Sequence, residues 1–372
     1  MIYLDNAATT PLDKEVIDEM TRVMQKHFGN PSSVHTLGRE ARVIIEDSRN
    51  MVAKLLNVSP SSIYFTSCGT ESINMVFRSC VNDLGVRNII TSPIEHHAVL
   101  HAAENYRKEN KCEISFVNID KKGNINLNHL EELLKGKEKS LVCLMHVNNE
   151  IGNILPIKDV ANICNSNNAL FLCDTVQSMG KIVNDLRNIN VDFAVCSAHK
   201  FHGPKGIGFL YLREGVKLQP MLHGGGQERN MRSGTENIYG IAGLAKAFEV
   251  AHRNLDKNIS QIKSLKANMV QLLKKNIPDV AFNGESEENG IYHILNVVFP
   301  RTKKSDMLLY NLDIEGIAAS GGSACNSGSI SASHVLREIK SPEDRTSIRF
   351  SFSKYNTVEE IEKTIEILKK IL

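Results

Sequence analysis

Short apolar runs alternate along most of the chain with segments whose apolar residues recur at helical spacing. The apolar runs predict strands at 62–67, 87–92, 113–119, 140–147, 169–174, 192–197 and 206–212. Helices are expected to begin near Glu71, His96, Leu127, Ile157 and Val176. Because continuously apolar strands that alternate with helices form a sheet buried on both faces, the pattern predicts an α/β fold with a mostly parallel sheet.

Two helices are expected before the first of these strands. The text TPLDKEVIDEMTRVM predicts the first helix, with Thr10 as its N-cap and Pro11 in its first turn. The apolar face of this helix would carry Val16, Met20, Val23 and Met24. The second helix is expected over 39–56.

The pattern changes after residue 237. A long helix is predicted over 238–275, and strands are predicted at 293–299, 315–320 and 347–352, with helices between and after them. These elements predict a smaller α+β domain that packs on the large one. We therefore expect a large domain at 13–257 and a small domain formed by 1–12 with 258–372.

Composition and charge exclude several classes of function. The chain has 44 Lys and Arg against 42 Asp and Glu, a net charge of +2, so no broad basic excess is present to bind nucleic acid. No apolar run is long enough to cross a bilayer, and the start MIYLDNAATTPLDKE does not read as a secretory signal. We expect a cytoplasmic protein with no membrane or direct nucleic-acid partner.

The eight cysteines include no C-x-x-C pair, so neither a zinc ribbon nor a thioredoxin motif is expected, and no metal site is predicted. Seven lie in or beside apolar text, where cysteine usually behaves as a small buried hydrophobe. Cys325 differs because its neighbours in GGSACNSGSISAS are Gly, Ser, Ala and Asn, which predicts an exposed loop and an accessible thiol.

Residues that follow three of the predicted strands suggest a ligand site, since ligands of open α/β sheets bind at the carboxyl ends of strands. Gly69 and Thr70 open a helix and could cradle a phosphate, although Thr70 could also be a simple N-cap. Asp174 either faces a cation or caps the next helix. Lys200 lies in the Gly-rich text SAHKFHGPKG and could form a Schiff base. Together these groups predict a pyridoxal 5'-phosphate site.

Ten stretches in order make the resemblance specific. They are YLDNAATTP, FGNPSSVH, FTSCGTESIN, EHHAV, MHVNNEIG, CDTVQSMGK, SAHKFHGPKGIG, HGGGQERNMRSGTEN, GGSACNSGS and SIRFSFSKYNT. With these motifs the chain resembles the cysteine desulfurases of the NifS/IscS type, which are fold-type I pyridoxal phosphate enzymes of aminotransferase class V. The likeness runs nearly end to end.

The resemblance implies a role for each matching residue. Lys200 should bind the cofactor covalently, Asp174 should pair the pyridine nitrogen, and Gln177 should bond the ring hydroxyl. The residues expected to hold the phosphate are Gly69, Thr70, Ser197 and His199, joined by Thr235 from a second subunit, which implies a homodimer. The groups expected around the ring and the substrate are His96, Asn149, Arg349 and Asn30.

Within that set, His96 should stack on the ring and move protons, although without the other motifs a satisfied core or cap histidine would be the preferred interpretation. Asn149 should contact the cofactor and, with Arg349, the substrate carboxylate, and Asn30 should lie nearby. The implied reaction converts L-cysteine to L-alanine and leaves a persulfide on Cys325. The sulfur would then pass to an iron–sulfur scaffold protein or a tRNA thiolation enzyme.

Three other readings stay open. A different fold-type I enzyme, such as a selenocysteine lyase or an aminotransferase, would need Lys200 and Asp174 but not Cys325. A non-catalytic sulfur or metal scaffold could use Cys325 and His334 and would bind no cofactor. The sequence ends at the helix KTIEILKKIL, where longer relatives carry a tail, so docking to an iron–sulfur scaffold also stays open.

Overall fold

A computed structural model describes residues 1–137, 139–302, 304–321 and 333–372. Its main feature is a seven-stranded sheet in the order β2-β8-β7-β6-β5-β3-β4. All neighbouring strands are parallel except that β8 runs antiparallel to both β2 and β7. The strands are β2 Ile63–Thr66, β3 Asn88–Thr91, β4 Glu113–Phe116, β5 Ser140–Met145, β6 Leu170–Asp174, β7 Phe193–Ser197 and β8 Gly208–Leu212. The predicted α/β class and all seven predicted strands are confirmed.

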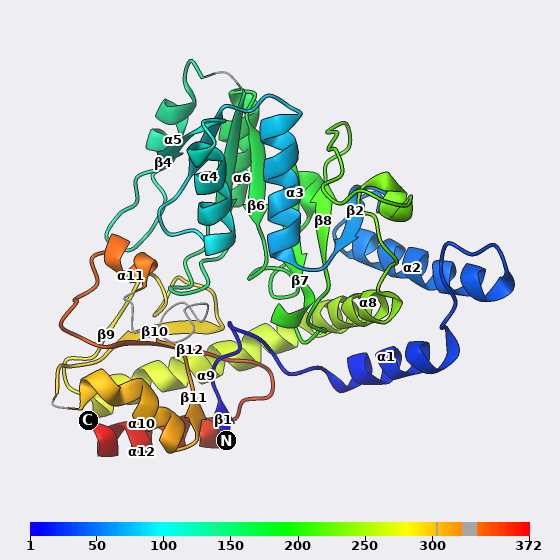
Figure 1. The fold of residues 1–372 in the computed structure, drawn as a ribbon. Helices are drawn as coiled ribbons and strands as arrows, with labels where there is room; N and C mark the ends of the chain where they lie inside the picture. The colour runs from blue at the N-terminus through cyan, green and yellow to red at the C-terminus, as the bar shows by residue number, and fades with distance from the viewer. Residues whose placement is uncertain (138, 303, 322–332) are drawn as a thin grey trace.

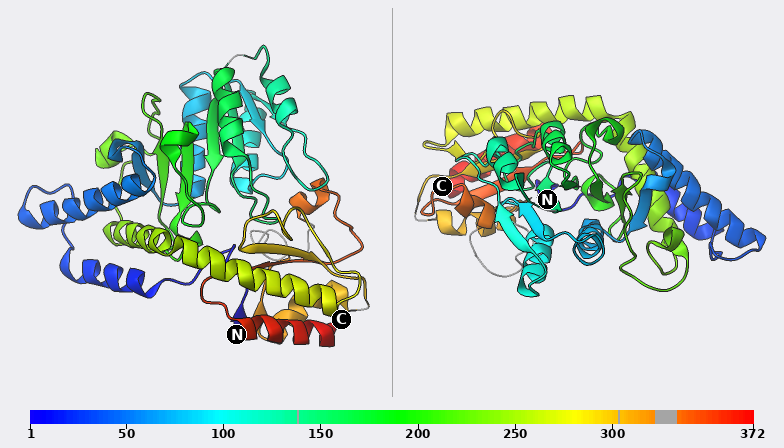
Figure 2. Two further views of the ribbon diagram at one scale, coloured as in Figure 1. Left: turned by 180° about the vertical axis from the view of Figure 1, so that it is seen from behind. Right: turned by 90° about the horizontal axis from the view of Figure 1, so that it is seen from above.

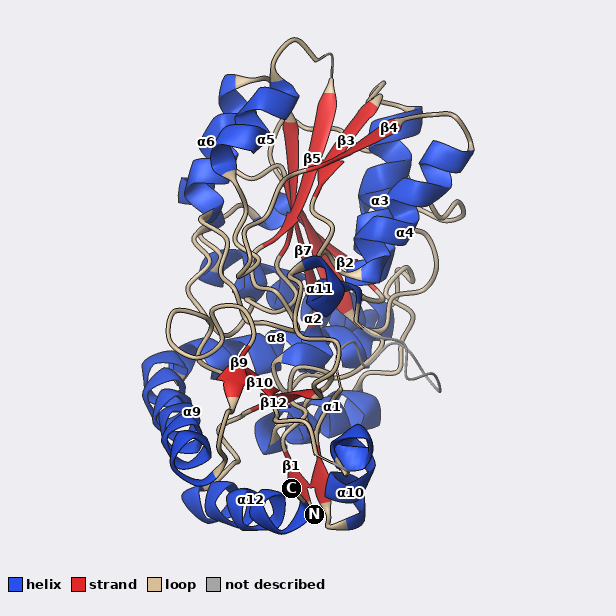
Figure 3. Ribbon diagram, turned by 90° about the vertical axis from the view of Figure 1, so that its left-hand side faces the viewer, coloured by secondary structure: helices blue, strands red, loops and turns tan. Residues whose placement is uncertain are grey.

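Helices cover both faces of this sheet, as Figure 3 shows edge-on. Helices α3 (Gly69–Asn82) and α4 (His97–Lys108) pack on one face around Phe77 and Leu172. On the other face pack α5 (Leu127–Leu134), α6 (Ile157–Ser166) and α8 (Ile238–Arg253), and the short α7 (Leu186–Ile189) lies between β6 and β7 in the chain. Because helices cover both faces of the sheet, a ligand would bind at the carboxyl ends of its strands.

A second apolar core lies around a three-stranded antiparallel sheet, β12-β10-β9, and the parallel pair β1-β11. These strands are β1 Ile2–Tyr3, β9 Ala281–Phe282, β10 Ile294–Val298, β11 Ile317–Ala318 and β12 Ser347–Ser351. The helices of this part are α9 Leu255–Asn276, α10 Leu308–Ile314 and α12 Val358–Ile371, with α11 His334–Glu338 beside the large sheet. Both chain ends lie here (Figure 1). The domain boundary near residue 257 stays a prediction.

Helices α1 (Lys14–Lys26) and α2 (Thr36–Leu55) form an arm that projects from the body (Figure 2). The prediction that Thr10 caps α1 is wrong, because Thr10 donates to the distant carbonyl of His199 and α1 begins only at Lys14. Met24 was expected on the buried face but is 48% exposed. With Phe28 and Val34, 71% and 88% exposed, it gives the arm an apolar surface.

Two further helix predictions need correction. No helix begins near Val176, because 175–181 forms tight turns in which Gly180 has a φ of +71° and passes close to Phe201. The single helix predicted over 238–275 is two helices that meet at Asn254. Of the seven cysteines outside the segment 322–332, six are buried and Cys68 is half-buried.

Candidate active site

A cavity of about 250 Å³ opens at the carboxyl ends of β5, β6 and β7. It brings together ten of the residues singled out from the sequence: Gly69, Thr70, His96, Asn149, Asp174, Gln177, Ser197, His199, Lys200 and Arg349. They come from six separate stretches of chain. The remaining walls include Ala7, Ala8 and Cys68, to which the sequence assigned no role.

The first turn of α3 forms one end of the cavity. The Gly69 amide donates to Ser197 Oγ at 2.8 Å, which joins the starts of α3 and the turn after β7. A Cβ at position 69 would lie 2.7 Å from Cγ2 of Val176, so only glycine fits without movement. The N-cap is Cys68, so the alternative of Thr70 as a simple N-cap is wrong. A helix N-terminus with free amides beside Thr70 and Ser197 hydroxyls suits a phosphate.

Asp174 ends β6 at the floor of the cavity, 7% exposed. Burial raises the pKa of its carboxyl, and the nearby charges of His96 and Lys200 oppose that rise. Its Oδ1 accepts a hydrogen bond from the Val176 amide at 3.0 Å, so the carboxylate also caps the turn that follows. A buried carboxylate that faces a cavity favours a cationic ligand group, such as a protonated pyridine nitrogen.

Lys200 lies in the single turn that follows β7. Its Nζ donates to the carbonyl oxygens of Ala7 and Ala8, both at 2.8 Å. The neighbouring His199 contacts Thr9 Oγ1 through Nδ1, and burial followed by the charge of Lys200 lowers its pKa to about 4. The N-terminal segment therefore positions the lysine, a contact between residues almost 200 positions apart that no local pattern reveals.

His96 is both a helix cap and part of the cavity wall. Its Nδ1 accepts a hydrogen bond from the Ala98 amide at 3.1 Å at the start of α4. A ring nitrogen that accepts cannot carry the proton, so the neutral ring holds its proton on Nε2. The structure thus joins the two readings that the sequence set apart.

Arg349 on β12 also lines the cavity, and it is 1% exposed. Its guanidinium donates to Asp5 Oδ1 and to the Asn149 carbonyl, each at 2.8 Å. Arg349 Nε has no hydrogen-bond partner among the described residues. A buried guanidinium with a donor to spare fits a carboxylate-bearing ligand.

Two predicted residues, Asn30 and Thr235, lie elsewhere. Asn30 is exposed between α1 and α2, where its Oδ1 accepts from the Ser32 amide. Thr235 lines a separate cavity of about 170 Å³ beside Arg232. Cys325 lies outside the residues that the structure describes.

Over the described ranges, no helix is both long and apolar enough to cross a bilayer. In the same part of the chain, His, Cys, Asp and Glu side chains form no group of three or more that could hold a metal ion.

Comparison with known proteins shows the same pattern over the whole chain. Residues 2–364 match the aminotransferase class-V family. A cysteine desulfurase IscS of Dictyoglomus turgidum is 41% identical, with 100% of this chain and 94% of the relative covered. A cysteine desulfurase IscS of Methanosarcina thermophila is 39% identical, at 100% and 92% coverage. A solved NifS-like protein superposes with a TM-score of 0.91 at 38% identity, covering 100% of this chain and 98% of that one.

Proposed function

The chain belongs to the aminotransferase class-V family, and from this membership and its active-site cavity we propose that it is a pyridoxal phosphate-dependent cysteine desulfurase. The observation that carries the proposal is the convergence of Lys200, Asp174 and the Gly69–Ser197 cradle on one cavity. These are the groups that an aldehyde, a pyridine nitrogen and a phosphate require. The full-length likeness to cysteine desulfurases favours this activity over the other fold-type I enzymes.

The cavity fits the cofactor group by group. Gly69, Thr70, Ser197 and His199 would hold the phosphate at the start of α3, and Asp174 would keep the pyridine nitrogen protonated. When bound, pyridoxal phosphate supplies an electron sink next to the substrate amine. Burial raises the pKa of Asp174 in the ligand-free protein, and a bound cationic nitrogen would favour the ionised carboxylate.

Lys200 has two tasks in this proposal. Its Nζ would hold the cofactor, and as a free amine it could take the α-proton of the substrate. In the ligand-free chain Nζ rests on the carbonyls of Ala7 and Ala8, which hold it at the cavity wall. His96, protonated on Nε2, stands on the same cavity and can donate a proton there. Arg349 and Asn149 would bind the substrate carboxylate.

The sulfur leaves through Cys325. Its thiolate attacks the sulfur of the substrate, so that an S–S bond forms, the C–S bond breaks, and the carbon takes a proton to give alanine. The step needs no external oxidant, because the electron pair of the broken C–S bond stays on the carbon, which is reduced to the methyl group of alanine while the sulfur is oxidised to the level of a persulfide. An acceptor protein, either an iron–sulfur scaffold or a tRNA thiolation enzyme, would then receive the sulfur.

We also infer a cytoplasmic homodimer. Thr235 lies apart from the cavity of its own chain, as expected for a residue that serves a second subunit. The arm of α1 and α2 exposes Phe28 and Val34, and a monomer leaves this apolar surface in water. Sedimentation of the cofactor-loaded protein at micromolar concentration tests this inference.

Peptide mass spectrometry after a brief exposure to L-cysteine without reductant tests the activity. We expect one added sulfur on the Cys325 peptide, none in Lys200→Ala, and the wild-type result in Lys205→Ala, whose exposed lysine lies on the same loop. A protein that binds the cofactor but leaves Cys325 unmodified would be another fold-type I enzyme. A protein that cannot bind pyridoxal phosphate would contradict the whole proposal.

A further inference from the structure

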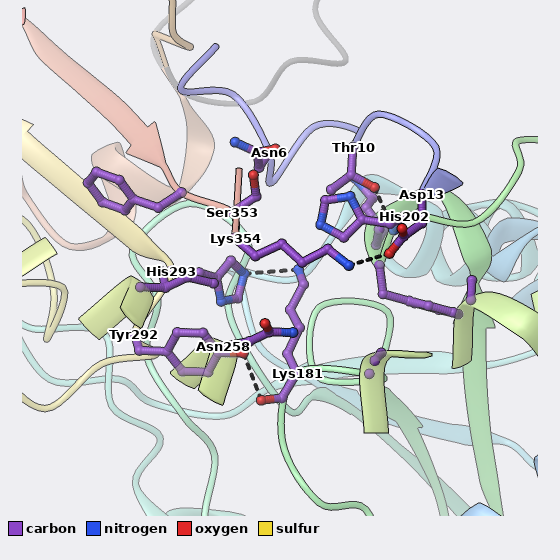
Figure 4. A pocket seen from close by; sticks show the side chains of 17 residues that line it. Asn6, Thr10, Asp13, Lys181, His202, Asn258, Tyr292, His293, Ser353 and Lys354 are labelled. Atoms are coloured by element: carbon purple, nitrogen blue, oxygen red, sulfur yellow. Dashed lines mark hydrogen bonds and ion pairs between the residues drawn. The ribbon is translucent and has the colours of Figure 1, made fainter. Parts of the chain in front are cut away.

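Lys181 is a buried lysine without an acidic partner. It is 8% exposed, and among the described residues no carboxylate lies within ion-pair distance of its Nζ. Instead Nζ lies 2.8 Å from Gln177 Oε1. It also lies 2.9 Å from His293 Nε2, and Tyr292 donates to the backbone carbonyl of Lys181 (Figure 4). A lysine is seldom buried in this way without a task, since removing its charge from water is costly.

The contacts of Lys181 continue to the active-site lysine. Gln177 Nε2 donates to the Ala7 carbonyl at 2.8 Å, and Lys200 Nζ donates to the same oxygen. A continuous series of hydrogen bonds therefore runs from His293, just before β10, through Lys181 and Gln177 to Ala7 and Lys200. The series joins the two cores of the molecule at the cavity wall.

Burial and the contacts of His293 favour a neutral amine at Lys181. Burial, and then the charges of Lys200 and Arg349, lower its pKa well below the ordinary value. His293 is also buried and its pKa is lowered, and its Nδ1 has no partner. An orphaned N–H is rarer than an orphaned acceptor, which favours the His293 proton on Nε2, where it donates to the lone pair of Lys181.

The charged and titratable groups around this series come from every neighbouring element. Those that act on Lys181 or on which it acts are His293, Lys200, Arg349, His199 and His202, and Lys266 acts on His293. None of them is an acid, so the pair of Lys181 and His293 gains no compensation for a positive charge. A donating neutral amine is the arrangement that satisfies Gln177 Oε1 at the smallest electrostatic cost.

We propose that Lys181 is a positioning residue that fixes the amide of Gln177, so that an N–H and not the carbonyl faces the active-site cavity. Lys181 holds Oε1 on the far side, Ala7 takes one amide hydrogen, and the second hydrogen is left for a ligand. The inference rests on the proposed function, because the ligand group it serves is the ring hydroxyl of pyridoxal phosphate.

The consequence is a shift in the titration of the bound cofactor. A donor to the ring oxygen stabilises its ionised form, so loss of the fixed N–H should raise the pH midpoint of the cofactor's absorption change. Hydrogen bonds to a charged group predict a rise of about half to one pH unit. The cofactor dissociation constant should rise by about three- to tenfold over the same range of free energy.

The experiment compares Lys181→Met with Lys266→Met in the full cofactor-loaded chain. Lys266 is a matched control, because it is 4% exposed, has a pKa lowered to about 8 by burial, and donates to the backbone of Ile291 two residues before His293. We expect the midpoint and the dissociation constant to change in Lys181→Met alone. Lys181→Gln, whose amide can donate to Gln177, should restore the wild-type midpoint.

Equal midpoints in wild type, Lys181→Met and Lys266→Met would overturn the inference, as would equal shifts in both variants. If Lys181→Met does not fold, His293→Leu removes the contact of Nε2 with Lys181 and its longer contact, 3.5 Å, with Gln177 Oε1, and should raise the midpoint by a smaller amount. An unchanged midpoint in His293→Leu would then overturn it. Failure of the wild-type chain to bind pyridoxal phosphate would contradict the proposed function instead, so the two failures are distinguishable.

Discussion

Asp174 and Arg349 both line the active-site cavity, and both are buried. They differ in what compensates the buried charge. Asp174 accepts a hydrogen bond from a backbone amide, and burial raises the pKa of its carboxyl. Arg349 is more deeply buried but already has the Asp5 carboxylate and the Asn149 carbonyl as partners. One charge is compensated by the protein itself, and the other by what binds in the cavity.

This difference separates stability from function. A buried charge with a partner supports the fold, and its removal leaves the partner charge unpaired. A buried charge whose partner is a ligand weakens the ligand-free fold and gains its compensation only on binding. Substitutions at the two residues should therefore change stability in opposite directions.

Asp174→Asn should show the largest effect. We expect kcat/KM to fall about 10²–10³-fold, because the group proposed to keep the ring nitrogen protonated is lost. The cofactor-free protein should become more stable by about 1–3 kcal/mol in urea unfolding, since an amide keeps the bond to the Val176 amide without a buried charge. Because the pKa of Asp174 is raised in the folded state, its ionisation destabilises the fold as the pH increases. The stability gained by Asp174→Asn should therefore be larger at pH 8 than at pH 4.

Arg349→Ala should act the other way. It leaves the Asp5 carboxylate without its partner, and we expect a loss of about 3–5 kcal/mol in urea unfolding of the cofactor-free chain. The double variant Asp5→Asn/Arg349→Ala should recover part of that loss, because the unpaired charge is gone. A stability in Arg349→Ala equal to that of Asp174→Asn would break the comparison.

The residues in and beside the cavity also differ in how far the sequence predicts their positions. Asp174 and Ser197 end buried strands and Lys200 lies in the turn after one, and a run of apolar residues followed by a polar one is a local signal. The contacts of Arg349 and Lys181 depend on residues 344 and 112 positions away, and no periodicity encodes them. Sequence motifs could name Arg349 by resemblance, but they gave no reason to choose Lys181.

The wrong helix predictions have the same cause. Thr10 has the side chain of a good N-cap, yet its hydroxyl bonds the His199 carbonyl from the loop that carries Lys200. The stretch after Asp174 has helical spacing, yet Gly180 turns the chain so that it packs on Phe201. In both cases a distant contact outweighs a local preference, and in both the departure lies beside the active site.

Glu95 is a buried carboxyl outside the active-site cavity. It tests whether burial without a cationic partner among the described residues lowers stability there as it does at Asp174. It is 1% exposed, and burial raises its pKa to about 8. A carboxyl with a raised folded pKa contributes its stability below about pH 4.5 and loses it as the pH rises toward 8. Glu95→Gln should therefore gain stability over wild type, on the order of 3 kcal/mol, between pH 5 and pH 8. Urea unfolding at several pH values measures it, and a constant difference would contradict it.

Gly69→Ala should show the smallest effect and tests packing instead of charge. The added Cβ would meet Cγ2 of Val176 at 2.7 Å and Ser197 Oγ at 3.3 Å, so the start of α3 must move away from the turn after β7. Because the Gly69 amide and Ser197 are part of the proposed phosphate cradle, we expect the cofactor dissociation constant to rise about tenfold, or about 1.4 kcal/mol. Equilibrium dialysis with pyridoxal phosphate measures the constant.

Gly215→Ala is the matched control for that prediction. Gly215 has open space around it but a φ of +90°, so alanine there introduces backbone strain of about 1–3 kcal/mol far from the cradle. It should lower the midpoint of urea unfolding and leave cofactor affinity unchanged, whereas Gly69→Ala should lower affinity more than stability. If the two variants weaken cofactor binding equally, cofactor affinity follows global stability. The Gly69–Ser197 cradle would then have no special role in holding the phosphate.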